Sequence, residues 1–137
     1  MSESFVLNKQ LHRDTTLVAD LSLCRCLLMN DARYPWLILV PRIAGLVEFH
    51  EVPRMHRETL YDEIEMASRA LMRISDAHKL NVAALGNQVS QLHIHIIARQ
   101  LDDPAWPGPV WGVGDAQPYA DETKVSLLSD LSKLLTE

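Results

Sequence analysis

Two histidines separated by one apolar residue, His93 and His95, are the side chains in this chain best suited to chemistry. An imidazole changes charge near neutral pH, so it can attack an electrophile, pass a proton or bind a metal ion. The pair stands in a run where polar and branched apolar residues alternate, which is typical of a half-buried β-strand. We therefore expect one face with Gln91, His93 and His95, and a core-facing side with Leu92, Ile94, Ile96 and Ala98.

The residues alone leave three interpretations of this pair open. The two imidazoles could be ordinary polar groups on a strand face, or one of them could be a nucleophile. They could also bind a metal, because this spacing lets two imidazoles converge on one ion. A metal site needs a third ligand, and the candidates are His50, His56 and Glu51.

The preceding residues narrow the choice. The run from Asn81 through Gly86 and Val89 to His95 resembles the signature of the histidine triad (HIT) family. That signature has three histidines separated by single apolar residues, with an asparagine and a glycine upstream. In the register that also matches Ala98 and Arg99, Gln91 stands at the first histidine position. His93 is then the second histidine and His95 the third. A second register makes these two the first pair, with Ile97 replacing the third.

The resemblance implies a covalent mechanism. His93 would attack the α-phosphorus of a nucleotide ester or amidate, and water would then displace the nucleotidyl group from the histidine. The main-chain carbonyl at Gln91 would orient the attacking ring, and His95 would stabilise the charge that develops. Amide groups would bind the nucleotide, and the candidates are Asn81, Asn87 and Gln88.

A weaker resemblance to the same family covers residues 27–42. In relatives an Asn or Asp at this point holds the ribose hydroxyls, which makes Asn30 and Asp31 the candidates here. Trp36 stands where many relatives carry a histidine, and we interpret it as a core or rim aromatic residue. Arg42 and Arg99 are the cations that could attract a phosphate chain, although surface arginines are common.

Composition limits the classes of protein to which this chain can belong. With 137 residues, 47% of them hydrophobic, the chain is expected to form one domain over residues 1–137, which the resemblance implies is HIT-like. No run reaches the roughly 18 to 20 apolar residues of a membrane span, and the first residues do not form a secretion signal, so we expect a cytoplasmic protein. A net charge of −5 disfavours duplex nucleic acid as a partner. Cys24 and Cys26 are expected to be reduced and buried.

The periodicity predicts an α+β domain with an antiparallel sheet of about five strands, one long helix and a C-terminal helix. The resemblance implies that this sheet is HIT-like. The expected strands are 15–20, 22–30, 36–40, 79–85 and 92–99, and the expected helices are 51–78 and 121–136. Residues 102–119 hold four prolines and three glycines, so we expect a loop there without regular structure. Its tryptophans, Trp106 and Trp111, would close over a base, contact a second subunit or pin the loop to its own domain.

These observations together predict a nucleotide hydrolase or nucleotidyl transferase that acts on dinucleoside polyphosphates or nucleoside phosphoramidates. Two alternatives remain: a nucleotide-binding module without turnover, suggested by Gln91, and a metal-dependent hydrolase that uses His93 and His95. The resemblance also implies a homodimer, and the covalent mechanism needs no metal or other cofactor.

Overall fold

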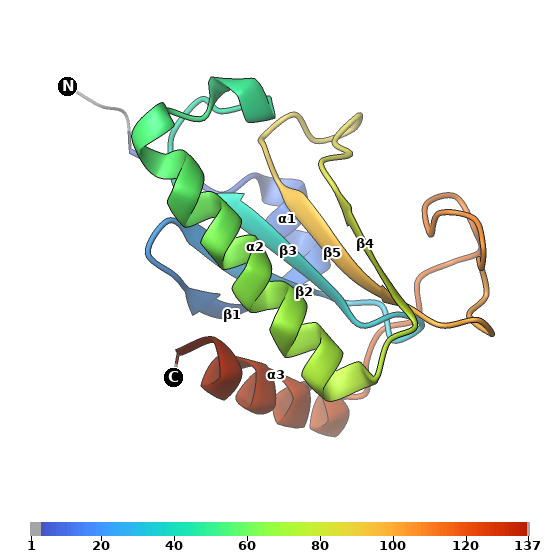
Figure 1. Cartoon of the computed structure of the whole chain (residues 1–137). Coiled ribbons are helices and arrows are strands. Elements are labelled where there is room, and N and C mark those ends of the chain that lie inside the picture. Colours follow the sequence, from blue (N-terminus) through green and yellow to red (C-terminus); the bar gives the residue numbers. More distant parts are fainter. Residues whose placement is uncertain (1–3, 137) are drawn as a thin grey trace.

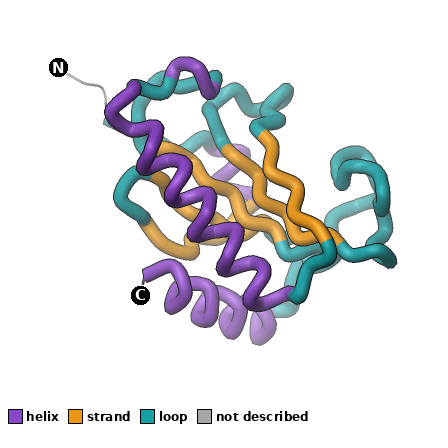
Figure 2. Tube along the Cα trace, viewed as in Figure 1, coloured by secondary structure: helices purple, strands orange, loops and turns teal. Residues whose placement is uncertain are grey.

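The computed structural model describes residues 4–136 and has the predicted α+β architecture. One antiparallel sheet has the strand order β1-β2-β3-β5-β4 (Figures 1 and 2). Its strands are β1 (Thr15–Asp20), β2 (Cys24–Met29), β3 (Trp36–Pro41), β4 (Lys79–Ala83) and β5 (Ile94–Arg99). The helices in the described residues are α1 (Lys9–Asp14), the short 3-10 helix η1 (Phe49–Glu51), α2 (Arg54–Ser75) and α3 (Asp121–Thr136).

The predicted elements are present, with shorter bounds for the long helix and for the strands predicted at 22–30, 79–85 and 92–99. Helix α2 begins after Pro53, whose fixed φ suits a helix start, and it ends where Asp76 takes the left-handed conformation at φ 50°. Residues at the two ends of the predicted helix, 51–53 and 76–78, therefore lie outside it. Helix α1 was not predicted, because its six residues bury only Leu11 and show no helical period.

Both faces of the sheet are covered. On one face α2 and α3 pack over β1, β3 and β5, with α2 crossing the sheet in front of these strands (Figure 1). That core contains Leu37, Leu39, Ile94 and Ile96. On the other face α1, residues 5–7 and part of the 102–119 loop cover a second core, with Tyr34, Trp36, Ile38 and Ile97.

The expectation of a half-buried strand is therefore wrong for β5. Every residue of β5 is buried, because the second cover closes over the face that carries His95. The opposite face behaves as predicted, since Leu92, Ile94, Ile96 and Ala98 are all buried. Alternation identified the two faces correctly, but it could not reveal a cover formed by distant segments.

A buried carboxylate joins α2 to the start of β2. Glu63 accepts hydrogen bonds from the backbone N–H of Leu23 at 2.9 Å and of Cys24 at 2.7 Å. Cys24 and Cys26 are free and buried, as predicted. Burial and the Glu63 charge raise the pKa of Cys26 to about 12, so this thiol stays protonated.

The 102–119 loop has no helix or strand, as predicted, but it is firmly attached. The buried Asp103 carboxylate pairs with Arg99, and its Oδ1 also accepts the backbone N–H groups of Ala105 and Trp106. Within residues 4–136 the structure contains no helix long and apolar enough to cross a membrane.

Candidate active site

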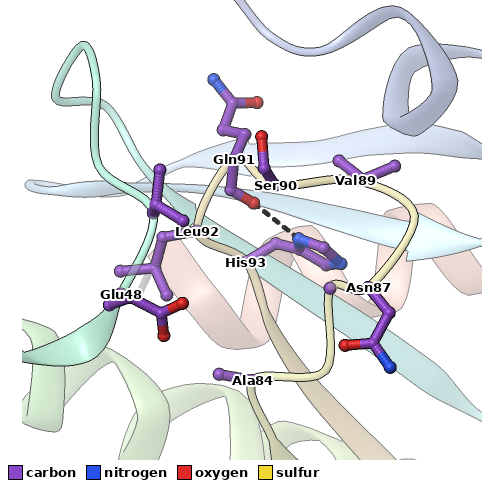
Figure 3. Close-up of a pocket in the computed structure, with 10 residues that line it drawn as sticks. Glu48, Ala84, Asn87, Val89, Ser90, Gln91, Leu92 and His93 are labelled. Carbon is purple, nitrogen blue, oxygen red and sulfur yellow. Dashed lines mark hydrogen bonds between the residues drawn. The ribbon is translucent and has the colours of Figure 1, made fainter.

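His93 lies directly before β5, and its ring is oriented by the main chain. Its Nδ1 is 2.7 Å from the carbonyl oxygen of Gln91, as the dashed line in Figure 3 shows. A carbonyl oxygen only accepts hydrogen bonds, so Nδ1 carries the proton and Nε2 keeps its lone pair. Nε2 makes no hydrogen bond to the part of the chain that the structure describes.

Two cavities share the His93 ring. The first has a volume of about 330 Å³ and lies between the 84–92 segment and Val47 and Glu48 (Figure 3). The second has a volume of about 380 Å³ and extends past His95 to Trp36 and Trp111. Both are also lined by Gly86, Asn87 and Val89. An electrophile bound at this junction would meet the free nitrogen of His93.

Gly86 allows the close approach of the chain to the His93 ring. A Cβ atom at this position would lie 3.0 Å from Cε1 of His93 and 2.5 Å from the carbonyl oxygen of Val89. The turn at 86–89 therefore packs against the imidazole because residue 86 has no side chain.

Burial lowers the pKa of His93 and outweighs the Gln91 carbonyl contact, which acts to raise it. The ring is therefore neutral at neutral pH, the form in which Nε2 is nucleophilic.

His95 has both ring nitrogens engaged. The indole N–H of Trp36 donates to Nδ1 at 3.0 Å, and Nε2 lies 3.0 Å from the carbonyl oxygen of Leu85. The His93 and His95 ring centroids are 4.7 Å apart. Burial, with a smaller electrostatic contribution from the neighbouring His93 imidazole, lowers the pKa of His95 to about 4. In this conformation His95 is neutral and has no free nitrogen for attack.

Gln91 contributes its main chain, and its side chain points away from the His93 ring (Figure 3). The side-chain oxygen accepts the backbone N–H of Asn8 at 2.9 Å, and the side-chain nitrogen donates to the carbonyl of Val6 at 2.9 Å. Gln91 therefore ties the N-terminal segment to the site.

Of the predicted amide groups, two lie at the site and one does not line it. Asn87 lines both cavities and Gln88 lines the second. Asn81 instead accepts a 2.8 Å hydrogen bond from Arg99 and is absent from the lining of either cavity.

Asn30 and Asp31 line a neighbouring cavity of about 370 Å³, which shares Trp36 and Trp111 with the second His93 cavity. Their side chains already bind the chain itself. Asp31 is buried and accepts from the guanidinium of Arg33 and the backbone N–H of Gln117, while Asn30 accepts the backbone N–H of Tyr119.

The ionised state of Asp31 is stabilised by these partners. Burial acts to raise the pKa of this carboxyl group, but the hydrogen bonds and charge of Arg33 hold it below its ordinary value. Ribose binding by Asn30 and Asp31 stays a prediction, and it would require hydroxyl groups to share or replace these contacts.

Other sequence-based candidates lie away from the site. The side chain of Arg42 donates to the carbonyls of Leu21, Ser22 and Leu23, and Arg99 pairs with Asp103, so neither arginine lines a His93 cavity. No three His, Cys, Asp or Glu side chains within residues 4–136 form a cluster that could hold a metal ion. The metal-site hypothesis therefore has no third ligand among His50, His56 and Glu51 in this geometry.

Three residues at the site make contacts that the sequence did not predict. Trp36 is buried in the core, as expected, but it also donates to His95. Trp111 places its ring centroid 5.0 Å from that of His95. Glu48 lines the first cavity. Trp106 instead packs against Arg99 and His78, so both loop tryptophans contact their own domain. No local pattern signals these contacts, because the partners are far apart in the chain.

Comparison with known proteins defines the family of this protein. Residues 10–102 match the HIT domain, so the chain belongs to the histidine triad family. Comparison with curated proteins found no match.

Solved structures of similar proteins extend over nearly the whole chain. A histidine triad protein from Marinobacter aquaeolei is 44% identical, with a TM-score of 0.94, and the match covers 98% of each chain. A histidine triad protein from Bradyrhizobium japonicum is 42% identical, also with a TM-score of 0.94, over 97% of this chain and 99% of the other. One from Sinorhizobium meliloti is 42% identical, with a TM-score of 0.92, over 96% and 97%. The likeness therefore includes the 102–119 loop and α3, which lie beyond the matched HIT segment.

Proposed function

We propose that the protein is a nucleotide hydrolase or nucleotidyl transferase in which His93 forms a covalent intermediate with the α-phosphate of its substrate. The observation that carries this proposal is the 2.7 Å contact between His93 Nδ1 and the Gln91 carbonyl, which leaves Nε2 as a lone-pair donor at the junction of two cavities. Phosphoanhydrides and phosphoramidates of a nucleoside monophosphate are the substrate classes that membership of the family suggests.

The reaction has two displacements. In the first, Nε2 of His93 forms a bond to phosphorus, and the leaving group departs with the electron pair of its bond. The ring then carries a positive charge, which the Nδ1–H bond to the Gln91 carbonyl stabilises. In the second, water attacks phosphorus, loses a proton and releases the nucleoside monophosphate, which restores the neutral imidazole. A transferase would use another acceptor in place of water.

The surroundings of His93 suit a phosphate. Asn87 and Gln88 provide side-chain amide donors, and the 86–89 turn packs against the His93 ring through Gly86. The alternative nucleophile, His95, lacks a free nitrogen because Trp36 and Leu85 occupy both. This favours the register with Gln91 at the first triad position.

A second candidate function is nucleotide binding without turnover. It is favoured by one observation: the Gln91 side chain holds the N-terminal segment, so only two imidazoles stand at the site. A binding module would retain the affinity for a nucleotide but would form no bond between His93 and phosphorus.

The test is to trap the intermediate. Purified protein is mixed with adenosine phosphoramidate or a dinucleoside polyphosphate in excess chelator, quenched without acid, and its intact mass is measured. We expect a nucleotidyl adduct that His93→Ala abolishes, with turnover lowered at least about 10³-fold. His50→Ala, which removes an exposed histidine, is the matched control and should retain both the adduct and turnover.

The outcomes separate the hypotheses. An adduct that survives in His93→Ala and disappears in His95→Ala would refute the assignment of the nucleophile. Nucleotide binding with neither adduct nor turnover would establish the binding module instead.

A further inference from the structure

The hydrogen bond between Trp36 and His95 determines where the protons of the site are. An indole N–H only donates, so Nδ1 of His95, 3.0 Å away, must be unprotonated. The Leu85 carbonyl only accepts, so the remaining proton is on Nε2. These two contacts allow a single neutral tautomer. Protonating Nδ1 would place two N–H groups against each other inside the protein, and burial opposes the added charge.

No imidazole of the site is then an acid that can give a proton to the leaving group. The Nδ1–H of His93 points at the Gln91 carbonyl, on the side of the ring away from the attacking nitrogen. His95 keeps one proton, and a neutral imidazole does not release it near neutral pH. The other ionisable side chains that line the two cavities are the carboxyl groups of Asp14 from α1 and Glu48. Ionised, they accept hydrogen bonds.

We propose that Trp36 is a positioning residue that keeps His95 neutral, so that the leaving group departs without a proton from the triad. The site is therefore selective for weakly basic leaving groups, such as phosphates and carboxylates, over amines. This inference rests on the function proposed above and selects phosphoanhydrides, or mixed anhydrides with a carboxylic acid, within its substrate classes.

The physical reason is the stability of the departing group. A phosphate or carboxylate spreads the electron pair it receives over several oxygens, whereas an amine must be protonated to leave. General acid catalysis contributes about 10²- to 10⁴-fold when a positioned acid is present. An enzyme without such an acid loses that factor for amines and retains its rate for weakly basic leaving groups. His95 still donates a hydrogen bond, which stabilises charge without transferring a proton.

The indole bond also acts on the turn beside the nucleophile. Trp36 fixes the direction of the His95 ring, and that ring binds the carbonyl of Leu85, the residue before Gly86. Gly86 in turn contacts the His93 ring. Removing the indole N–H thus changes the protonation of His95 first, and loosens the 86–89 turn through it.

The first experiment reads the ring nitrogens directly. In ¹⁵N-histidine-labelled protein, we expect His95 to show the Nε2–H tautomer and to remain neutral from pH 8 down to pH 5. Trp36→Phe removes the N–H and should make the protonation of His95 at least about tenfold more favourable, equivalent to one pKa unit. Trp111→Phe is the matched control, because Trp111 also packs against the His95 ring but makes no hydrogen bond to it. It should leave the protonation of His95 unchanged.

A His95 ring that titrates near its ordinary pKa in the unchanged protein would overturn the proposal, whether or not Trp36→Phe folds. So would a Trp36→Phe variant that folds and leaves His95 as it was.

The second experiment measures the dependence of rate on the leaving group. The substrates are the nitrophenyl and phenyl esters of AMP, which have equal charge and similar size, and the butylamide of AMP. We expect kcat/KM to fall at least about 100-fold from the nitrophenyl ester to the butylamide, with the phenyl ester between them. At pH 5.5 the fall should be smaller in Trp36→Phe, where a larger fraction of His95 is protonated than in the unchanged protein. Similar rates for nitrophenyl ester and butylamide would overturn the selectivity.

The two experiments distinguish this inference from the proposed function. If no ester is turned over and no adduct forms, the proposed function fails and the selectivity fails with it. The nitrogen spectra then still decide whether Trp36 fixes His95. If the esters react but show no dependence on the leaving group, the proposed function stands and the inference is refuted.

Discussion

Replacing Asp103 with asparagine should strongly destabilise the protein, because it breaks a buried ion pair while keeping the shape of the side chain. The Asp103 carboxylate accepts from Nε of Arg99 at 2.7 Å and from Nη2 at 3.0 Å. The two side chains are 5% and 1% exposed. Arg99 also donates to Asn81 and lies over the rings of Tyr34 and Trp106, so it cannot turn towards water without disrupting these contacts.

Asp103→Asn should lower the free energy of unfolding by about 3–5 kcal/mol, the usual cost of leaving one partner of a buried ion pair without its counter-charge. An amide at residue 103 keeps one acceptor but turns an N–H group towards the guanidinium. The control is Glu65→Gln on α2. Glu65 pairs with Arg69 at the same i,i+4 spacing, but these side chains are 47% and 79% exposed. Losing this exposed ion pair should lower the free energy of unfolding by about 0–1 kcal/mol.

The assay is equilibrium unfolding in urea, followed by circular dichroism, for the protein and both variants. Equal decreases in the free energy of unfolding for the two variants would refute the reasoning that burial decides how much this ion pair stabilises the fold. So would a decrease below about 1 kcal/mol for Asp103→Asn.

The pH dependence gives an independent check on the same residue. Hydrogen bonds from Arg99 are the largest cause that holds the pKa of Asp103 below its ordinary value, and burial opposes them. A lowered folded-state pKa means that this stabilisation is present above the unfolded pKa, about 4, and is lost as the pH falls through the folded pKa. The difference between the protein and Asp103→Asn should therefore be constant from pH 7 to pH 5 and shrink below about pH 4. A difference that grows on acidification would contradict the assignment.

Two further predictions concern the turn and the sheet edge. Gly86→Ala should lower turnover at least about tenfold, with a smaller effect on stability. The reason is that a Cβ at this position would lie 2.5 Å from the Val89 carbonyl oxygen and 3.0 Å from the His93 ring. Normal turnover in this variant would show that the turn adapts freely. The resemblance to the family implies a dimer, in which we expect the edge strand β4 to pair with β4 of a second copy. Light scattering should then give the mass of a dimer, and Val82→Lys on this strand should give a monomer. A monomeric mass for the unchanged protein would refute the expected dimer.

The order of the elements and the choice of His93 as the candidate nucleophile follow from local pattern. Alternation from Gln91 to Arg99 identifies a strand and its faces, and the apolar period of residues 60–74 identifies the long helix. Gly86 and the two histidines carry the family resemblance because the close turn and the imidazoles occupy neighbouring positions in the chain. These properties depend on residues a few positions apart, which is why the sequence alone reveals them.

The environment of the histidines was decided by the tertiary structure. Trp36 reaches His95 across 59 positions, and residues 102–119 cover the face of β5 that alternation predicted to be open. Gln91 turns its side chain to the N-terminal segment, and Asp31 uses its carboxylate to hold the loop. Each of these contacts joins residues that have no common period or motif. A sequence can therefore show that His95 stands beside His93, but the folded chain alone determines which nitrogen carries the His95 proton, because the donor and the acceptor that fix it come from different segments.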